Sequence, residues 1–108
     1  MFGFNKKKKK HKDSMPLESI LALNYKRIQY ASMRDPDTYK EIRLGTDGAL
    51  NIIGDKMHIV CSGESVFSCT LDELSAGELM SHDGIVLKGF DHVSGEERTV
   101  TAFYLKKD

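Results

Sequence analysis

The stretch that decides the fold is residues 41–71, which read EIRLGTDGALNIIGDKMHIVCSGESVFSCTL. Apolar and polar residues alternate through most of it, as they do in strands that bury one face. Turn signals rich in glycine, serine and aspartate interrupt the alternation at 45–48, 54–55 and 62–65. We therefore predict four consecutive antiparallel strands joined by tight hairpins.

The register of these hairpins follows from keeping the apolar side chains on one face, because a slip of one residue turns a whole strand over. A three-residue loop at 45–48, a type II′ turn at 54–55 and a three-residue loop at 62–65 satisfy this condition. A two-residue loop at the last turn would send Phe67 and Cys69 to the other face. The expected pairs are Leu44–Leu50, Ile42–Ile52, Ile52–Met57, Leu50–Ile59, Cys61–Phe67 and Ile59–Cys69. The predicted inward-facing set is Ile42, Leu44, Leu50, Ile52, Met57, Ile59, Cys61, Phe67, Cys69 and Leu71.

A second hairpin is expected from residues 84–90 and 98–105, with Ser94-Gly95 supplying the turn. The expected pairing puts one set of apolar side chains on the core face, namely Ile85, Leu87, Phe103 and Leu105. The opposite face is also apolar, and such a face is either covered or binds a partner. Its candidate interaction patch consists of Val86, Phe90, Val100 and Tyr104.

Residues 15–33 are the natural cover for that apolar face. Pro16 suits a first helical turn, and apolar residues recur at helical spacing, so we predict a helix over about 16–33 that ends before Pro36. The alternative is a strand over 23–33. A short helical turn is expected near 71–79, with Thr70 as its N-cap.

These elements predict a mainly β fold. Six to seven antiparallel strands would form a meander curled into a small sandwich or barrel, in a single domain spanning 14–108. A meander of this strand count resembles small β-barrel binding domains, including the pleckstrin-homology-like kind, with 23–33 then as a strand. The chain departs from those domains in finishing with a strand, where they usually carry a C-terminal helix.

Charge is unevenly distributed along the chain. Residues 1–12 carry six lysines and no acid, so the remaining residues carry a net charge of −6 within a chain of zero net charge. We expect residues 1–13 to form a disordered basic arm. The arm is a candidate contact for an anionic membrane, whereas the acidic body argues against nucleic acid. The candidate contact residues are Phe2, Phe4, Lys6, Lys7, Lys8, Lys9, Lys10 and Lys12.

The sequence contains no recognisable catalytic, cofactor-binding or metal-binding motif. His82-Asp83 and Asp91-His92 flank one predicted strand, which separates the two aspartates by about 26 Å at about 3.3 Å per residue. Cys61 and Cys69 are too far apart in the predicted register for a disulfide. Reduced thiols, together with no apolar segment typical of a secretion signal, favour a cytoplasmic location, with the arm allowing peripheral contact at the inner membrane face.

We therefore expect a small non-catalytic cytoplasmic domain that binds a protein partner or a membrane surface, with no cofactor and no small-molecule substrate. The first alternative is a structural subunit that buries the Val86, Phe90, Val100 and Tyr104 patch in a homo-oligomer. The second alternative, ranked last, is a ligand-binding barrel or enzyme with His58 or His82 near a pocket.

Overall fold

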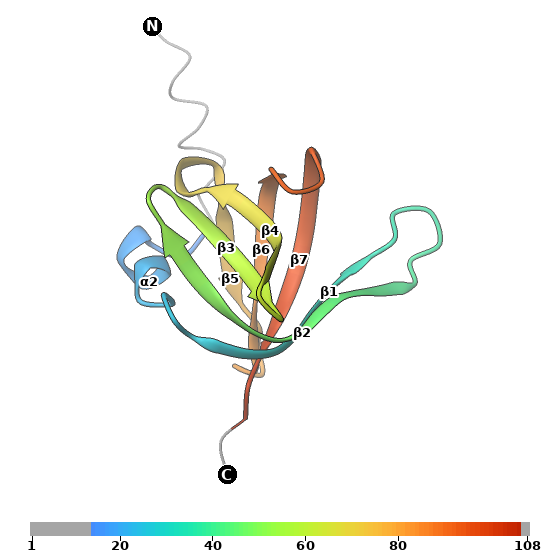
Figure 1. The fold of residues 1–108 in the computed structure, drawn as a ribbon, viewed down its shortest axis with the longest axis horizontal. Coiled ribbons are helices and arrows are strands. Elements are labelled where there is room, and N and C mark those ends of the chain that lie inside the picture. The colour runs from blue at the N-terminus through green and yellow to red at the C-terminus, as the bar shows by residue number, and fades with distance from the viewer. Residues whose placement is uncertain (1–13, 107–108) are drawn as a thin grey trace, which may run out of the picture.

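The protein is mainly β, as predicted, in a computed structural model that describes residues 14–106. Seven antiparallel strands form one sheet in the order β4-β3-β2-β1-β7-β6-β5 (Figure 1). The elements in chain order are α2 (Leu17–Leu21), β1 (Arg27–Arg34), β2 (Glu41–Ile53), β3 (Lys56–Cys61), β4 (Glu64–Thr70), the 3₁₀ turn η1 (Leu71–Glu73), β5 (Ser75–Glu78), β6 (Gly84–Asp91) and β7 (Glu96–Tyr104).

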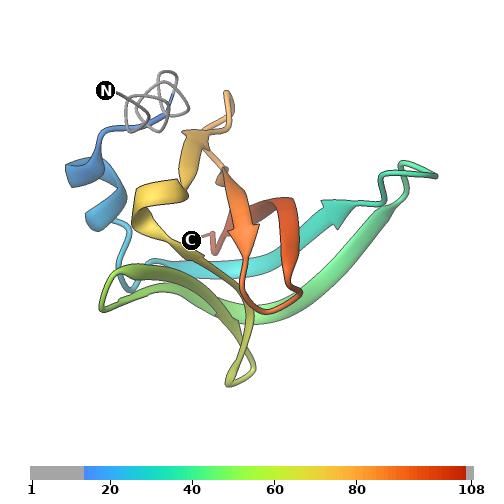
Figure 2. The same ribbon diagram turned by 90° about the horizontal axis from the view of Figure 1, so that it is seen from above.

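The sheet coils strongly but is not closed into a barrel, because its edge strands β4 and β5 do not pair with each other. Instead, β4 comes to lie against β6, so the two ends of the sheet face each other across the core. The far half of the β1–β2 hairpin projects away from this body (Figures 1 and 2). The core is filled by Ile20, Ile28, Ala31, Leu50, Met57, Ile59, Cys61, Phe67, Cys69, Leu74, Ala76, Ile85, Leu87, Val100 and Ala102.

The predicted hairpin at 45–48 does not exist. Strand β2 runs straight through it, and Gly45 and Gly48 pair with Ala31 and Ile28 of β1. These glycines allow β3 to approach β2 closely. A Cβ on Gly45 would lie 2.6 Å from Cys61 Cβ, and a Cβ on Gly48 would overlap the carbonyl oxygen of residue 60. The Leu44–Leu50 and Ile42–Ile52 pairs are therefore wrong.

The chain reverses earlier, between Arg34 and Glu41. The Asp35 carboxylate accepts backbone N–H groups from Asp37 (2.7 Å) and Thr38 (3.2 Å), and Tyr39 adopts a left-handed φ of 62°. An aspartate that accepts from the backbone two residues ahead is a common turn device. The sequence pattern indicated only the end of a helix in this segment. Ile42 therefore lies in the projecting hairpin, where 39% of it is exposed.

The turn at Gly54 and its register are confirmed. Gly54 has a φ of 63°, as the first central position of a type II′ turn requires. Leu50 lies opposite Ile59, and Ile52 lies opposite Met57. These residues pack in or against the hydrophobic core.

The loop between β3 and β4 is shorter than predicted. Ser62 and Gly63 both have positive φ, which defines a two-residue loop. A bulge then adds Val66 to β4, so that Phe67 lies opposite Ile59 and Cys69 opposite Met57. The predicted pairs are wrong, but the bulge supplies the extra residue that the loop lacks. The predicted inward orientation of Phe67 and Cys69 is therefore confirmed, and both are fully buried.

The long N-terminal helix is also wrong. Helix α2 ends at Leu21, and the strand alternative for 23–33 is closer to the observed β1. Asn24 and Tyr25 mark the change, because Asn24 Oδ1 accepts the Ile52 N–H at 2.8 Å and Tyr25 has a φ of 74°. Asparagine is also a poor residue for helix interiors, because its side chain competes with the helix for nearby backbone groups.

The helical turn predicted near 71–79 is confirmed only at its start. Residues Leu71–Glu73 form the 3₁₀ turn η1, and the chain then enters β5. Thr70 does not cap η1 with its side chain; its hydroxyl instead lies 3.3 Å from His92 Nε2. A single turn leaves β5 free to pair with β6 through Ser75–Glu78.

The second hairpin is confirmed, but the faces of its second strand are exchanged. Ile85 pairs with Ala102 and Leu87 with Val100, and all four side chains are buried on the core face. Phe103 consequently points to the outer face. Leu105, also predicted to point inward, lies beyond β7 and is 45% exposed.

Candidate functional site

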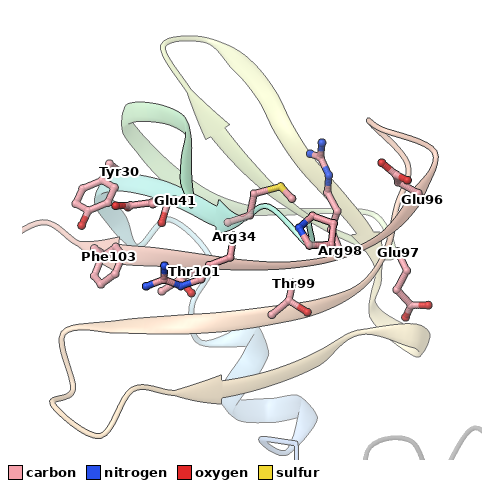
Figure 3. A pocket seen from close by; sticks show the side chains of 12 residues that line it. Tyr30, Arg34, Glu41, Glu96, Glu97, Arg98, Thr99, Thr101 and Phe103 are labelled. Atoms are coloured by element: carbon pink, nitrogen blue, oxygen red, sulfur yellow. The ribbon is translucent and has the colours of Figure 1, made fainter. Parts of the chain in front are cut away.

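A groove opens where β1 and β7 diverge. The two strands pair only from Ile28–Tyr104 to Met33–Val100, after which β1 continues into the projecting hairpin. Residues Glu96–Thr99 of β7 thus have a paired strand on one side only, namely β6. The groove has a volume of about 550 Å³ (Figure 3). It is lined by Tyr30, Ser32, Met33, Arg34, Pro36, Glu41, Glu96, Glu97, Arg98, Thr99, Thr101 and Phe103.

One end of the groove is aromatic. The rings of Tyr30 and Phe103 stack with their centroids 4.6 Å apart, and the Arg43 guanidinium lies 3.8 Å from the Tyr30 centroid. Both aromatic side chains remain partly exposed. A half-exposed aromatic pair with a cation on one face offers a surface for apolar or planar groups.

The other end of the groove is acidic. Arg98 pairs with Asp91 at 3.3 Å, which balances its charge, whereas Arg34 donates to the uncharged Tyr39 carbonyl at 2.9 Å and keeps its charge. In contrast, Glu96 and Glu97 at this end, and Glu41 nearer Tyr30 (Figure 3), are exposed and have no ion-pair partner among residues 14–106. Tyr30 and Phe103 lie at the end opposite Glu96 and Glu97 (Figure 3). The groove lining therefore carries three glutamates without an ion pair and one guanidinium without an ion pair, that of Arg34, so the balance of charge is negative.

The β7 wall of the groove is anchored by the buried carboxylate of Asp91. Its Oδ1 accepts the N–H groups of Ser68 and Val93, each at 2.9 Å, and its Oδ2 accepts from Ser94 and Arg98, each at 3.3 Å. The His92 N–H also donates to the Ser68 carbonyl at 2.7 Å. These bonds join β4 to the β6–β7 turn and hold Arg98 at the groove.

A second, smaller hollow continues from the groove over the outer face of β5 and β6. It has a volume of about 310 Å³ and shares Thr99 with the groove. Its far end is Ser14, whose hydroxyl accepts the Ala76 N–H at 2.9 Å while the Met15 N–H donates to the Ala76 carbonyl at 2.8 Å. The N-terminal segment thus joins the fold at the edge of β5.

A third hollow, of about 540 Å³, lies between α2 and η1. Its lining is mostly apolar, and Leu17 and Leu21 on its rim are 56% and 44% exposed. Asp55 and Asp72 add acidic groups to the same rim.

The predicted interaction patch is not a single surface. Val100 is fully buried in the core, and Tyr104 packs against the core beneath Lys26, whose Nζ lies 4.7 Å from the ring centroid. Val86 and Phe90 lie on the outer face, where Phe90 is 39% exposed. The exchange of faces in β7 separates them and brings Thr99, Thr101 and Phe103 outward instead.

The candidate membrane contacts Phe2, Phe4, Lys6, Lys7, Lys8, Lys9, Lys10 and Lys12 lie outside the described residues. Tyr30 was not predicted as a functional residue, because it lay within the predicted helix. The alternation of Thr99, Thr101 and Phe103 is the signal that could have located the outer face of β7.

The described histidines do not converge on one site. His58 Nδ1 lies 3.0 Å from the Ser65 hydroxyl, and burial together with Lys56 lowers the pKa of its imidazole. His82 lies 3.4 Å from Glu78, and His92 packs edge-on against Phe90. Within residues 14–106 no group of three potential ligands could hold a metal ion.

The two cysteines, both buried, form no disulfide. Burial, with a contribution from Asp47, raises the pKa of the Cys61 thiol, so the thiol stays protonated at neutral pH. Burial and Glu78 likewise raise the pKa of Tyr104. Neither group has the lowered pKa of an activated nucleophile.

No helix within residues 14–106 is long and apolar enough to cross a lipid bilayer. Comparisons with family models, with curated protein sequences and with solved structures find no match to this chain.

Proposed function

We propose that this chain is a non-catalytic protein-interaction module that binds an extended segment of a partner in the groove between β1 and β7. The observation that carries the proposal is that residues Glu96–Thr99 line an open groove while pairing with β6 alone. An extended segment can add to such a strand through main-chain hydrogen bonds.

The side chains of the groove support the same proposal. Strand addition supplies affinity but little selectivity, which comes from the alternate side chains that flank the added segment. Here the Tyr30–Phe103 pair favours an apolar or planar group, and Glu96 and Glu97 favour a basic one. A membrane surface is the weaker candidate, because the apolar rim formed by Leu17 and Leu21 also carries Asp55 and Asp72.

The test is selection of peptides from a displayed library of random dodecapeptides against the full-length protein. We expect selected peptides to shift the NMR amide signals of Thr99 and Thr101. Glu97→Lys should weaken their binding about tenfold, which corresponds to about 1.4 kcal/mol. Glu64→Lys is the matched control, because Glu64 is an exposed strand glutamate on β4, away from the groove lining.

Two results would contradict the proposal. One is that no peptide is selected. The other is that selected peptides bind Glu97→Lys and Glu64→Lys equally well and shift signals on other strands. Concentration-dependent shifts at Thr99 without any peptide would indicate that a second copy of the chain occupies the groove.

A further inference from the structure

The acidic end of the groove lacks its counterions within the described fold. Glu96 and Glu97 have no ion-pair partner there, and Glu41 has none elsewhere in the lining; Arg98 is paired with Asp91, whereas Arg34 donates to the uncharged Tyr39 carbonyl and keeps its charge. An occupant rich in lysine would complete this surface, and complementary charge governs both partner choice and association rate. The most basic segment of the protein is its own residues 6–12, with six lysines.

We propose that this lysine-rich segment occupies the groove of its own chain and competes with the partner segment. The inference rests on the proposed function of the groove. In physical terms, the segment supplies a tethered ligand whose effective concentration is set by the length of chain that joins it to the fold.

The second hollow and the groove adjoin, and together they offer a path for the segment. The chain joins the fold at Ser14, which lines the second hollow, and that hollow meets the groove at Thr99. Crossing from β5 to β7 spans two strand spacings, about 10 Å, whereas eight extended residues span about 26 Å. Lysines 6–10 can therefore reach the acidic end without disturbing Ser14.

The charges along this path favour placing the lysines in the groove rather than in the second hollow. Lys88 lines the second hollow and would repel lysines there. The residue next to Ser14 in the sequence is Asp13, whose charge is opposite to that of Lys88. The lysines then meet Glu96 and Glu97 further along.

The third hollow is the competing location. It also begins at Ser14, and its apolar lining would accept Phe2 and Phe4. Its rim carries two aspartates, Asp55 and Asp72, and Asp72 already interacts with another group. Three unpaired glutamates make the groove the better match for six lysines.

The experiment uses the full-length protein with a nitroxide attached to the cysteine of Asn5→Cys. Both native thiols are buried, and wild type treated with the same nitroxide reagent checks that they take up no label. We expect the amide signals of Glu97, Thr99 and Thr101 to broaden. The broadening should disappear in about 1 M NaCl, where the screening length is about 3 Å. Glu96→Lys/Glu97→Lys should remove it, and Asp55→Lys, the control in the third hollow, should not.

Competition is measured separately with the selected peptides. Replacing the six lysines by glutamine in the full chain should tighten peptide binding about tenfold, because the tethered competitor is lost. Peptides that bind both proteins equally, with no broadening in the groove, would overturn this inference and leave the proposed function intact. Broadening in the groove without any selected peptide would support this inference and contradict the proposed function.

Three further results would overturn the inference. Broadening at Leu17 and Leu71 would place the segment in the third hollow. Broadening in isotope-labelled wild type mixed with unlabelled, nitroxide-bearing protein would show contact between two copies. Broadening unaffected by salt and by Glu96→Lys/Glu97→Lys would show that charge does not hold the segment.

Discussion

The carboxylate of Asp91 is completely buried, yet it accepts four hydrogen bonds from three backbone amides and one guanidinium. A buried charge is tolerated only where its hydrogen-bonding capacity is filled. Asp91 meets this condition and, at the same time, ties Ser68 of β4 to the β6–β7 turn. The same residue therefore links the edge strand β4 to the end of β6 and positions Arg98 in the groove.

Asp91→Ala is predicted to lower the free energy of unfolding by about 3 kcal/mol. The change leaves the N–H groups of Ser68, Val93 and Ser94 without their acceptor and leaves Arg98 without its ion pair. Asp91→Asn retains an acceptor oxygen and should cost less. The measurement is urea denaturation followed by circular dichroism. Equal losses for the two variants would show that the acceptor geometry at this site is unimportant.

At the scale of the element, β2 is the strand that most departs from expectation. Its glycines were interpreted as turn residues, and turn chemistry does favour glycine. In the folded protein they instead remove Cβ atoms where β3 approaches most closely. Sequence alone does not distinguish these two uses, because each is a glycine within an alternating apolar pattern.

Gly48→Ala is predicted to destabilise the protein by about 1–3 kcal/mol, since the added methyl overlaps the backbone of β3. Gly77→Ala in β5 is the matched control: it has no heavy atom within 4 Å of its added Cβ, and the change should be within about 0.5 kcal/mol. Thermal or urea denaturation compares the two. A neutral Gly48→Ala would argue that β2 is not packed closely on β3 here.

The predictable parts of the fold were those governed by local alternation and glycine turns. Gly54 fixed the β2–β3 register, and Ser94-Gly95 located the β6–β7 hairpin. The groove was not predictable, because it depends on where β1 leaves β7. That point is set by pairing between segments about seventy residues apart, from Met33 to Val100, which no local pattern encodes.

For the molecule as a whole, the core lies inside the coil of one sheet, and the β1–β2 hairpin extends beyond it (Figure 2). Strand β2 therefore has two energetically different halves. Leu50 is fully buried near its end, while Ile42 near its start is 39% exposed.

Leu50→Ala should lower the free energy of unfolding by about 2–5 kcal/mol, the range for a buried leucine that leaves a cavity. Ile42→Ala in the same strand should cost less than about 1 kcal/mol, because little apolar surface is buried there. Urea denaturation midpoints test the contrast. Comparable losses would mean that the projecting hairpin is covered by something in solution.

The bond between Arg98 and Asp91 has a consequence for how recognition in this groove can diversify. Exchanges at Glu96, Glu97 or Thr99 would alter what the groove accepts while leaving the hydrogen bonds between β4 and the β6–β7 turn untouched. A change at Arg98 would leave the buried Asp91 carboxylate without its ion-pair partner, at the point where β4 is bonded to the β6–β7 turn. Descendants of this protein could thus acquire new binding preferences one substitution at a time at the first three positions, whereas Arg98 and Asp91 would have to be replaced together.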